Sequence, residues 1–353
     1  MRVLVTGGAG FIGSAFVRAW IADGAGEVLN VDKLTYAGDP SNLEEAATAP
    51  GHRLLETDIR DERIMQAAFE TFRPQAVVNL AAETHVDRSI DHPTAFVDSN
   101  VVGTAVLLEC ALRHWQGLDA AGRTAFRFLQ VSTDEVFGDL GQDGVFTEAS
   151  PIAPSSPYAA SKAAADLLAL AFHRTYGLGV IVANATNTFG PHQFPEKLIP
   201  LMIVKARRGE ALPLYGGGGQ VRDWLHVDDH VAALRRLLAS GRPGERYLVG
   251  ARRPMSNLDM VRRVAALLDE LLPHSPHRPH RRLIQTAADR PGHDRRYAAD
   301  PSKLERELGW RPAVDFEAGM RATVSWFLEN GEWCERAARR YQQQRLGVPS
   351  PPL

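Results

Sequence analysis

A tyrosine and a lysine stand four residues apart, as Tyr158 and Lys162, in a segment whose apolar spacing predicts a helix. Residues at this spacing lie on one helix face about one turn apart, so the ammonium can sit near the phenol and favour its ionised form. An unassisted tyrosine titrates near about pH 10, and a neighbouring positive charge would make Tyr158 a candidate base near neutrality. Such pairs also arise often by chance, so this one does not define a site alone.

Two carboxylates, Asp134 and Glu135, follow the apolar run 128–131, which we expect to be a strand. Neighbouring side chains of a regular strand point to opposite faces, so both can serve one substrate only if the strand ends before them. Glycines from Gly138 onward indicate that it does. Taken alone, an adjacent Asp-Glu pair is more often a solvated turn.

The elements that must position these groups begin with a strand, a glycine loop and a helix. The apolar run 2–6 leads into the loop, and apolar residues recur at helical spacing from Phe16. Glycine allows the tight turn and the close approach of a pyrophosphate, whose charge meets the helix N-terminus. Read from Gly7 the spacing is Gly-x-x-Gly-x-x-Gly, and read from Gly8 it is Gly-x-Gly-x-x-Gly, so both dinucleotide-binding variants stay open.

A second predicted strand, 27–31, ends at Asp32, about twenty residues beyond the glycines. An acidic side chain there binds the ribose 2′-hydroxyl and repels a 2′-phosphate, which favours NAD over NADP. The adjacent Lys33 weakens this inference, and Asp32 is alternatively a simple turn residue.

Strands and helices then alternate along the chain. We expect further strands at 53–56, 76–80, 179–183 and 245–249, and helices at 61–72, 93–115 and 158–176. This alternation predicts an α/β fold, a Rossmann-like NAD-binding doubly wound parallel sheet with ligands at the carboxyl ends of its strands.

The composition changes after residue 189, and we expect a smaller mixed α/β C-terminal substrate lobe. The dinucleotide-binding domain is predicted at 1–189, with returning segments at about 225–250 and 313–335. The lobe is predicted at 190–224 and 251–312. The polar, proline-rich end, 342–353, is predicted to be disordered.

The composition is that of an ordinary globular protein: 353 residues, 44% hydrophobic, 23% charged and a net charge of −2. This charge gives no reason to expect a nucleic acid or membrane partner. Two distant cysteines, Cys110 and Cys334, suggest no disulfide or zinc site and fit a reducing cytoplasm. No export signal or long uninterrupted apolar run is visible. Prolines scatter the histidines of 273–280, so no metal site is expected there.

Together these residues resemble the extended short-chain dehydrogenase/reductase superfamily and, within it, the dTDP-glucose 4,6-dehydratases. The match runs from Val3 to about Arg321. Superfamily membership rests on the glycine loop with Tyr158 and Lys162. The narrower family rests on the segments 32–38, 132–136, 194–200, 222–224 and 289–293. The Thr-Asp-Glu triplet at 133–135 discriminates the family from nucleotide-sugar 4-epimerases.

The resemblance implies NAD as cofactor, dTDP-glucose as substrate and dTDP-4-keto-6-deoxyglucose as product. Tyr158, assisted by Lys162 and hydrogen-bonded Thr133, would take the C4 hydroxyl proton while the C4 hydride passes to NAD⁺. Glu135 would take the C5 proton, and protonated Asp134 would assist loss of the C6 hydroxyl as water. The hydride would then return to C6. Two adjacent carboxyls must hold different protonation states for this chemistry.

The resemblance also implies two sets of binding residues. The cofactor set, besides Tyr158 and Lys162, comprises Gly7, Gly10, Phe11, Ile12, Gly13, Asp32, Lys33, Leu34, Thr35, Asp58, Ile59, Leu80, Ala81, Ala82, Thr84, Ser99 and Asn187. The substrate set comprises Thr84, Thr133, Asn187, Glu196, Lys197, Leu198, Arg222, Asn257, Arg290 and His293. His85 is either a catalytic base or a structural or substrate-contacting residue.

Two departures from the family pattern and two alternative functions accompany this interpretation. Phe137 stands where the family usually has tyrosine, and Thr188-Phe189 replaces an Asn-Tyr pair, so hydroxyl groups are missing. In a nucleotide-sugar 4-epimerase, Asp134 and Glu135 would have no catalytic role. A catalytically silent NAD-binding sensor or scaffold would not need Tyr158 and Lys162. By analogy we expect a homodimer paired through the helices 93–115 and 158–176.

Overall fold

The computed structural model describes residues 1–340, and the predicted disordered tail at 342–353 lies outside them. Seven parallel strands form the main sheet in the order β3-β2-β1-β4-β5-β6-β10. The predicted doubly wound parallel sheet is therefore confirmed. Its strands are β1 (Val3–Thr6), β2 (Val28–Asp32), β3 (His52–Glu56), β4 (Ala76–Asn79), β5 (Arg127–Thr133), β6 (Val180–Ala185) and β10 (Arg246–Val249).

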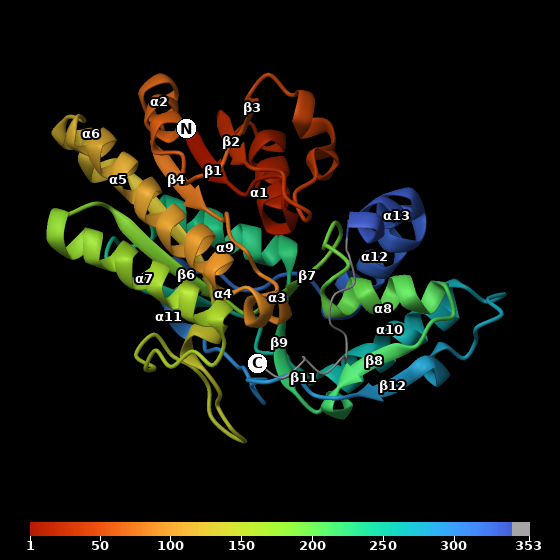
Figure 1. Ribbon diagram of the computed structural model, residues 1–353. Coiled ribbons are helices and arrows are strands. Elements are labelled where there is room, and N and C mark those ends of the chain that lie inside the picture. Colours follow the sequence, from red (N-terminus) through yellow and green to blue (C-terminus); the bar gives the residue numbers. More distant parts are fainter. Residues whose placement is uncertain (341–353) are drawn as a thin grey trace.

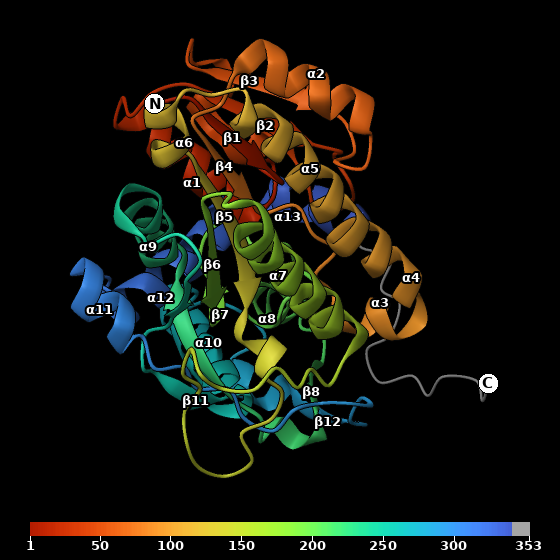
Figure 2. The same ribbon diagram turned by 90° about the vertical axis from the view of Figure 1, so that its left-hand side faces the viewer.

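Helices cover both faces of this sheet, as parallel strands that are apolar on both faces require. One face packs against α1 (Phe11–Ala22), α9 (Val227–Ser240) and α11 (Ser302–Leu308), together with the 3₁₀ segment η1 (Pro40–Thr48). The other face packs against α2 (Glu62–Phe72), α5 (Gly103–Gln116) and α7 (Pro157–Tyr176). Figure 2 shows the sheet between these two helix layers.

Helix α7, which carries Tyr158, has clear signals at both ends. The Ser156 hydroxyl accepts a hydrogen bond from the Ala159 N–H at 3.1 Å, and Pro157 occupies the first helical position. At the other end Gly177 adopts a left-handed conformation with φ +81°, which glycine tolerates without strain. The helix is therefore held in place from its first turn, where the candidate base lies.

The predicted helix 93–115 is continuous but not uniformly α-helical. It comprises α4 (Pro93–Phe96), the π-helical segment η2 (Val97–Val102) and α5. Within residues 1–340, this is the helix long and apolar enough to cross a membrane by length and composition. Half of its apolar window is buried, and α5 packs between α2 and α7, as a core helix of a globular domain does.

A second, smaller body forms at the carboxyl ends of the strands (Figure 1). Its core joins α8 (Leu198–Arg207), α10 (Asn257–Leu271), α12 (Phe316–Glu329) and α13 (Gly331–Arg340). Its strands form two small sheets: β7 (Asn187–Phe189), β9 (Val221–His226) and β11 (Pro254–Ser256), and β8 (Leu212–Tyr215) with β12 (Ile284–Ala287). The predicted domain boundaries stay a prediction, and the packing of α12 against α8 and α10 favours placing the segment 313–335 with the lobe.

Short elements complete the described chain. They are α3 (Val86–Asp91), α6 (Ala120–Ala125), and the 3₁₀ segments η3 (Asp134–Phe137), η4 (Gly216–Gly218) and η5 (His280–Leu283).

Candidate active site

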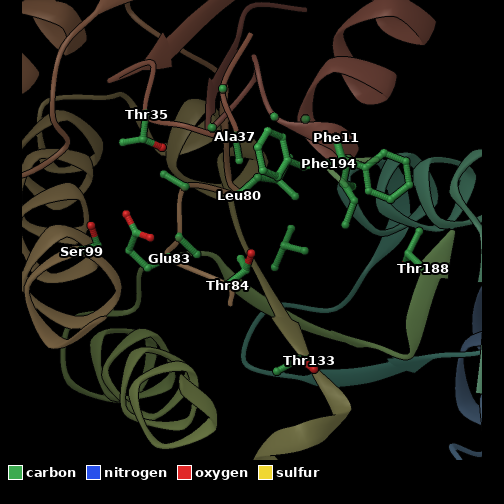
Figure 3. Close-up of a pocket in the computed structure, with 18 of the residues that line it drawn as sticks. Phe11, Thr35, Ala37, Leu80, Glu83, Thr84, Ser99, Thr133, Thr188 and Phe194 are labelled. Atoms are coloured by element: carbon green, nitrogen blue, oxygen red, sulfur yellow. The ribbon is translucent and has the colours of Figure 1, made fainter. Parts of the chain in front are cut away.

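A cavity of about 290 Å³ opens at the carboxyl ends of the central strands, between the sheet and the lobe. In Figure 3, Thr133 lies at the end of its strand, Glu83 and Thr84 lie on the segment after β4, and Phe194 faces them from the lobe side. The predicted residues that line the cavity are Gly7, Gly10, Phe11, Ile12, Gly13, Asp32, Lys33, Thr35, Asp58, Ile59, Leu80, Ala81, Ala82, Thr84, Ser99, Thr133, Asp134, Glu135, Tyr158, Asn187, Glu196 and Lys197. Most of the residues predicted to bind cofactor or substrate therefore lie together on the wall of one cavity.

The other predicted residues lie outside this wall. Leu34 lies two residues beyond Asp32, to which its N–H donates, and Leu198 begins α8. Lys162 is buried behind the wall. The remaining four belong to the lobe: Arg222, Asn257, Arg290 and His293.

Strand β5 ends at Thr133, and the next residues turn into the 3₁₀ segment η3. The prediction that the strand stops before the acid pair is confirmed. The Thr133 hydroxyl accepts the Glu135 N–H at 3.2 Å and caps the turn. It also lies 3.3 Å from Asp134 Oδ1. Both carboxyls consequently line one cavity and do not point to opposite faces of a strand.

The Tyr158 side chain is buried and lines the cavity together with Thr133. Burial is the main reason that its pKa is raised well above 10, and Glu135 and Asp134 add to this effect, while Thr133 opposes it. The sequence predicted a lowered pKa, and the structure differs because burial and two carboxyls outweigh the favourable contact.

Lys162 follows Tyr158 by one helical turn and is also buried. Its Nζ donates to the Val131 carbonyl oxygen at 2.6 Å. Burial lowers the pKa of this lysine to about 8, and the carboxylate of Asp166 opposes the shift. The ammonium is therefore held at the end of β5, directly behind the reactive residues.

The two acid-pair carboxyls have unequal surroundings. Burial raises the pKa of Asp134 well above its ordinary value, and Glu135 and Asp223 reinforce the shift. Burial also raises the pKa of Glu135, but Arg290, Arg222 and Lys197 all work in the opposite direction. Asp134 therefore retains a proton more readily than Glu135, because more cations face Glu135.

The glycine loop has the close approaches that a dinucleotide cradle requires. A Cβ at Gly13 would lie 2.1 Å from the Gly7 carbonyl oxygen, and one at Gly7, where φ is +69°, would lie 2.8 Å from the Ala81 nitrogen. Asp32 accepts hydrogen bonds from the N–H groups of Ala9 at 2.9 Å and Leu34 at 2.8 Å. A carboxylate has about four acceptor sites, so two remain for a ribose. These residues fit a nicotinamide dinucleotide.

On the lobe side, Glu196 and Lys197 line the cavity. The Tyr36 hydroxyl donates to Glu196 Oε1 at 3.3 Å, and Glu196 Oε2 is buried without a hydrogen-bond partner. Lys197 Nζ donates to the Thr84 carbonyl oxygen at 2.7 Å. An unpartnered buried oxygen at a cavity wall is available to a bound hydroxyl group.

Residues that the sequence reasoning missed hold the lobe cations in place. Asp87 binds Arg290 Nη1 at 2.9 Å and accepts the Tyr215 hydroxyl at 2.7 Å. Arg222 lies 4.1 Å from the centre of the Tyr297 ring and donates to the Asp294 carbonyl oxygen. His293 Nδ1 bonds to Asp289 at 2.6 Å.

Further missed residues line the cavity itself, namely Val31, Ala37, Gly38, Thr57, Glu83, Val131, Ser132, Ala185, Thr186, Gln193, Phe194 and His230. Several fall inside the family motifs, such as 32–38 and 132–136, so proximity to those motifs was the available signal. His230 had no such signal, because it comes from a helix distant in sequence.

The three residues that depart from the family pattern lie in different parts of the structure. Thr188 lines the cavity, and its hydroxyl lies 2.9 Å from His230 Nδ1. Phe137 packs against Phe146 in a small apolar cluster, and Phe189 packs in the lobe core. Only Thr188, of these three, meets the cavity.

His85 does not line the cavity and has a local structural contact. Its Nδ1 accepts the Arg88 N–H at 3.3 Å at the start of α3. Burial and then Lys197 lower the pKa of His85 to about 3, so the ring is neutral near pH 7. This geometry favours the structural role over the catalytic one.

Known proteins resemble the chain along nearly its whole length. A family model described as GDP-mannose 4,6 dehydratase matches residues 4–323. A probable dTDP-glucose 4,6-dehydratase of Sinorhizobium fredii is 52% identical over 349 residues, which cover 99% of each chain. The dTDP-glucose 4,6-dehydratase 1 of Escherichia coli is 49% identical over 344 residues, 95% of each chain.

Solved structures give the same result. The dTDP-glucose 4,6-dehydratase DesIV of Streptomyces venezuelae, crystallised with NAD bound, is 45% identical with a TM-score of 0.85, over 96% of this chain and 100% of that one. A UDP-glucose 4-epimerase of Thermus thermophilus in complex with NAD is more distant, at 31% identity and a TM-score of 0.81, over 94% and 100%. Sequence identity therefore ranks the dehydratases above the epimerases, and the chain belongs to the dTDP-glucose 4,6-dehydratase family of extended short-chain dehydrogenases/reductases.

Proposed function

We propose that this protein is an NAD-dependent dTDP-glucose 4,6-dehydratase that forms dTDP-4-keto-6-deoxyglucose. The observation that carries the proposal is the gathering of Thr133, Tyr158, Asp134 and Glu135 in the cavity that the glycine loop also lines. A hydride-transfer enzyme without a dehydration step needs the tyrosine but leaves the two carboxyls without a role. The relatives named above carry this activity in their names.

Tyr158 is the proposed base for the C4 hydroxyl proton. Thr133 lowers the pKa of Tyr158 and so favours the phenolate, and the Lys162 ammonium lies behind the same strand end. Bound NAD supplies the hydride acceptor for sugar C4 and, later, the hydride donor for C6. The protein residues hold the sugar so that the phenol meets its C4 hydroxyl.

The acid pair divides the elimination between its two members. Asp134, the more readily protonated carboxyl, is the proposed acid that gives a proton to the leaving C6 hydroxyl. Glu135, which faces Arg290, Arg222 and Lys197, is the proposed base for the C5 proton. This division requires different protonation states in adjacent carboxyls, and their unequal surroundings favour such a difference.

The cofactor and the substrate are assigned to opposite sides of the cavity. The glycine loop and Asp32 hold the dinucleotide, and Asp32 favours NAD because it would repel a 2′-phosphate. Glu196 and Lys197 contact the sugar nucleotide. The lobe residues proposed for the nucleotide and diphosphate are Arg222, Asn257, Arg290 and His293, since guanidinium groups form forked contacts with phosphates.

We also propose a homodimer in the cytoplasm. Four of the large apolar side chains that are exposed lie on the two helices expected at the interface: Val97 at 47%, Val102 at 44%, Leu167 at 54% and Tyr176 at 48%. Exposed apolar side chains grouped on neighbouring helices favour an interface. The two cysteines are free and buried, which is compatible with a reducing compartment.

The test is one incubation with dTDP-glucose, followed by the mass and the NMR spectrum of the product. We expect loss of one water molecule and no net consumption of NAD. Formation of dTDP-galactose, which has the mass of the substrate, would instead assign the chain to the epimerases. Absence of any conversion would favour a silent NAD-binding protein.

A further inference from the structure

A buried carboxylate outside the proposed chemistry lies next to its central strand. Asp166 is on α7, one helical turn beyond Lys162, and its side chain is fully buried. It does not line the cavity. A fully buried charge is costly to keep in a fold unless it has partners, so its contacts indicate what it does.

Asp166 is linked to the end of β5 through Asn184 of β6. The Asn184 side-chain amide donates to Asp166 Oδ2 at 2.9 Å and to the Thr133 carbonyl oxygen at 3.0 Å. These two bonds use both amide hydrogens of one residue. The orientation of Asn184, and with it the position of the Thr133 backbone, therefore depends on the carboxylate.

The second link runs through Lys162. Its ammonium donates to the Val131 carbonyl oxygen at 2.6 Å, and it interacts electrostatically with Asp166 on the same helix face. Both links thus end on backbone carbonyls of β5, at Thr133 and Val131, within the last three residues before the acid pair. Asn184 pairs with Ser132 in the sheet register, so the connection is part of the sheet itself.

We infer that Asp166 is a positioning residue for the dehydration: it orients Asn184, which bonds to the Thr133 carbonyl at the end of β5, and its negative charge favours the ammonium form of Lys162 beside the same strand. The inference rests on the proposed function and adds a residue to it. The carboxylate touches neither the cavity nor the reacting atoms, so it acts through these two neighbours.

The charged and titratable groups around Asp166 and Lys162 come from several elements. Burial raises the pKa of Asp166, while Arg246 of β10, 3.9 Å from Asp166 Oδ2, and Lys162 favour its charged form. Tyr158 of α7 with Asp134 and Glu135 of η3 lie toward the cavity. Burial lowers the pKa of Lys162 to about 8, and Asp166 opposes this shift. Loss of the Asp166 charge should therefore lower the pKa of Lys162 further and deprotonate it at a lower pH.

The deciding experiment compares Asp166→Asn with the wild-type enzyme, using kcat, KM and the pH dependence of kcat for dTDP-glucose. We expect kcat to fall about tenfold or more with KM changed less than about threefold, and the alkaline limb of the profile to move to lower pH. Asn184→Ala keeps the Asp166 and Lys162 charges, so it should lower kcat without moving that limb.

Asp229→Asn is the matched control for placing an amide at a buried aspartate. Asp229 is buried on α9, and it accepts the N–H groups of Ala313 and Val314. The Asp229→Asn variant should be less stable than the wild type and should leave the pH dependence of kcat unchanged. The inference is overturned if Asp166→Asn keeps the wild-type kcat and alkaline limb. If that variant does not fold, wild-type kcat in Asn184→Ala overturns it. The proposed function is tested separately, by measuring in parallel whether the wild-type enzyme removes water from dTDP-glucose.

Discussion

Thr133 at the end of β5 and Tyr158 in the first turn of α7 line the same cavity. This arrangement places the candidate base beside the acid pair, because Asp134 directly follows Thr133 in the chain and lines that cavity too. One substrate in the cavity can therefore meet a phenol and two carboxyls without moving to a second site. The relationship is the structural basis for assigning oxidation and elimination to one pocket.

Replacing Tyr158 with phenylalanine tests the proposed base. The ring and its edge contact with Phe96, at 6.3 Å between centres, remain, while the hydroxyl is lost. We expect kcat to fall by about 10²- to 10⁴-fold, the usual contribution of general acid–base catalysis. Steady-state assays measure this, with Tyr176→Phe at the exposed end of the same helix as the control. Turnover equal to wild type in Tyr158→Phe would remove Tyr158 from the mechanism.

Replacing Glu135 with glutamine separates oxidation from elimination. The amide cannot accept the C5 proton, whereas Tyr158 and Thr133 keep their places. We expect NADH absorbance to appear and persist after addition of dTDP-glucose, with water loss slowed by about 10²- to 10⁴-fold. Rapid-mixing absorbance and product mass record the two steps. Normal water loss in this variant would show that another group removes the C5 proton.

Asp134→Asn should make the folded protein more stable near neutral pH. The pKa of Asp134 is raised well above 3.8, so the folded state keeps a proton that the unfolded state releases. The protonated carboxyl therefore contributes its full stability below the ordinary pKa of the unfolded state. That contribution is lost as the pH rises through the raised pKa of the folded state. Because asparagine does not ionise, we expect a gain of about 0.5–2 kcal/mol in the free energy of unfolding at pH 7.

Urea unfolding at several pH values measures this gain, which should shrink as the pH approaches 3.8. Activity should fall in the same variant, since the proposed acid is lost. If Asp134→Asn is no more stable than the wild type at pH 7, the pKa of Asp134 is not raised in the folded protein.

The sheet and most of the cavity wall follow from local sequence signals. The glycine loop after a buried strand, and the break of β5 before Asp134, have physical causes that lie within a few residues. Helix α7 has its serine cap, its first-turn proline and its terminal glycine in the sequence. For this reason the sequence alone is enough to place the candidate base and the acid pair.

Other features depend on contacts between distant segments. The raised pKa of Tyr158 follows from its burial beside both carboxyls, which spacing along a helix does not reveal. Asp87 lies on α3, yet it holds Arg290 and Tyr215 of the lobe. Asp166 carried a usable signal, since it repeats the spacing of Tyr158 and Lys162 on one helix face, but its bond to Asn184 required the structure.

Leu167→Asp tests the proposed dimer interface. Leu167 is 54% exposed on α7, and a charge there should be harmless in a monomer and disruptive between two packed helices. We expect the mass in solution, measured by light scattering after size-exclusion chromatography, to fall from dimer to monomer. Leu54→Asp, at a 39% exposed position on β3, is the matched control and should remain dimeric. A dimer that survives Leu167→Asp would place the interface elsewhere.

The most direct measurement follows a deuterium label from C4 of dTDP-glucose through the reaction. If one pocket oxidises the sugar, removes water and returns the same hydride, the product loses one water molecule and carries the deuterium in its C6 methyl group. Mass spectrometry with NMR locates the label. A dehydrated product without deuterium at C6, or a labelled product of unchanged mass, would contradict the account.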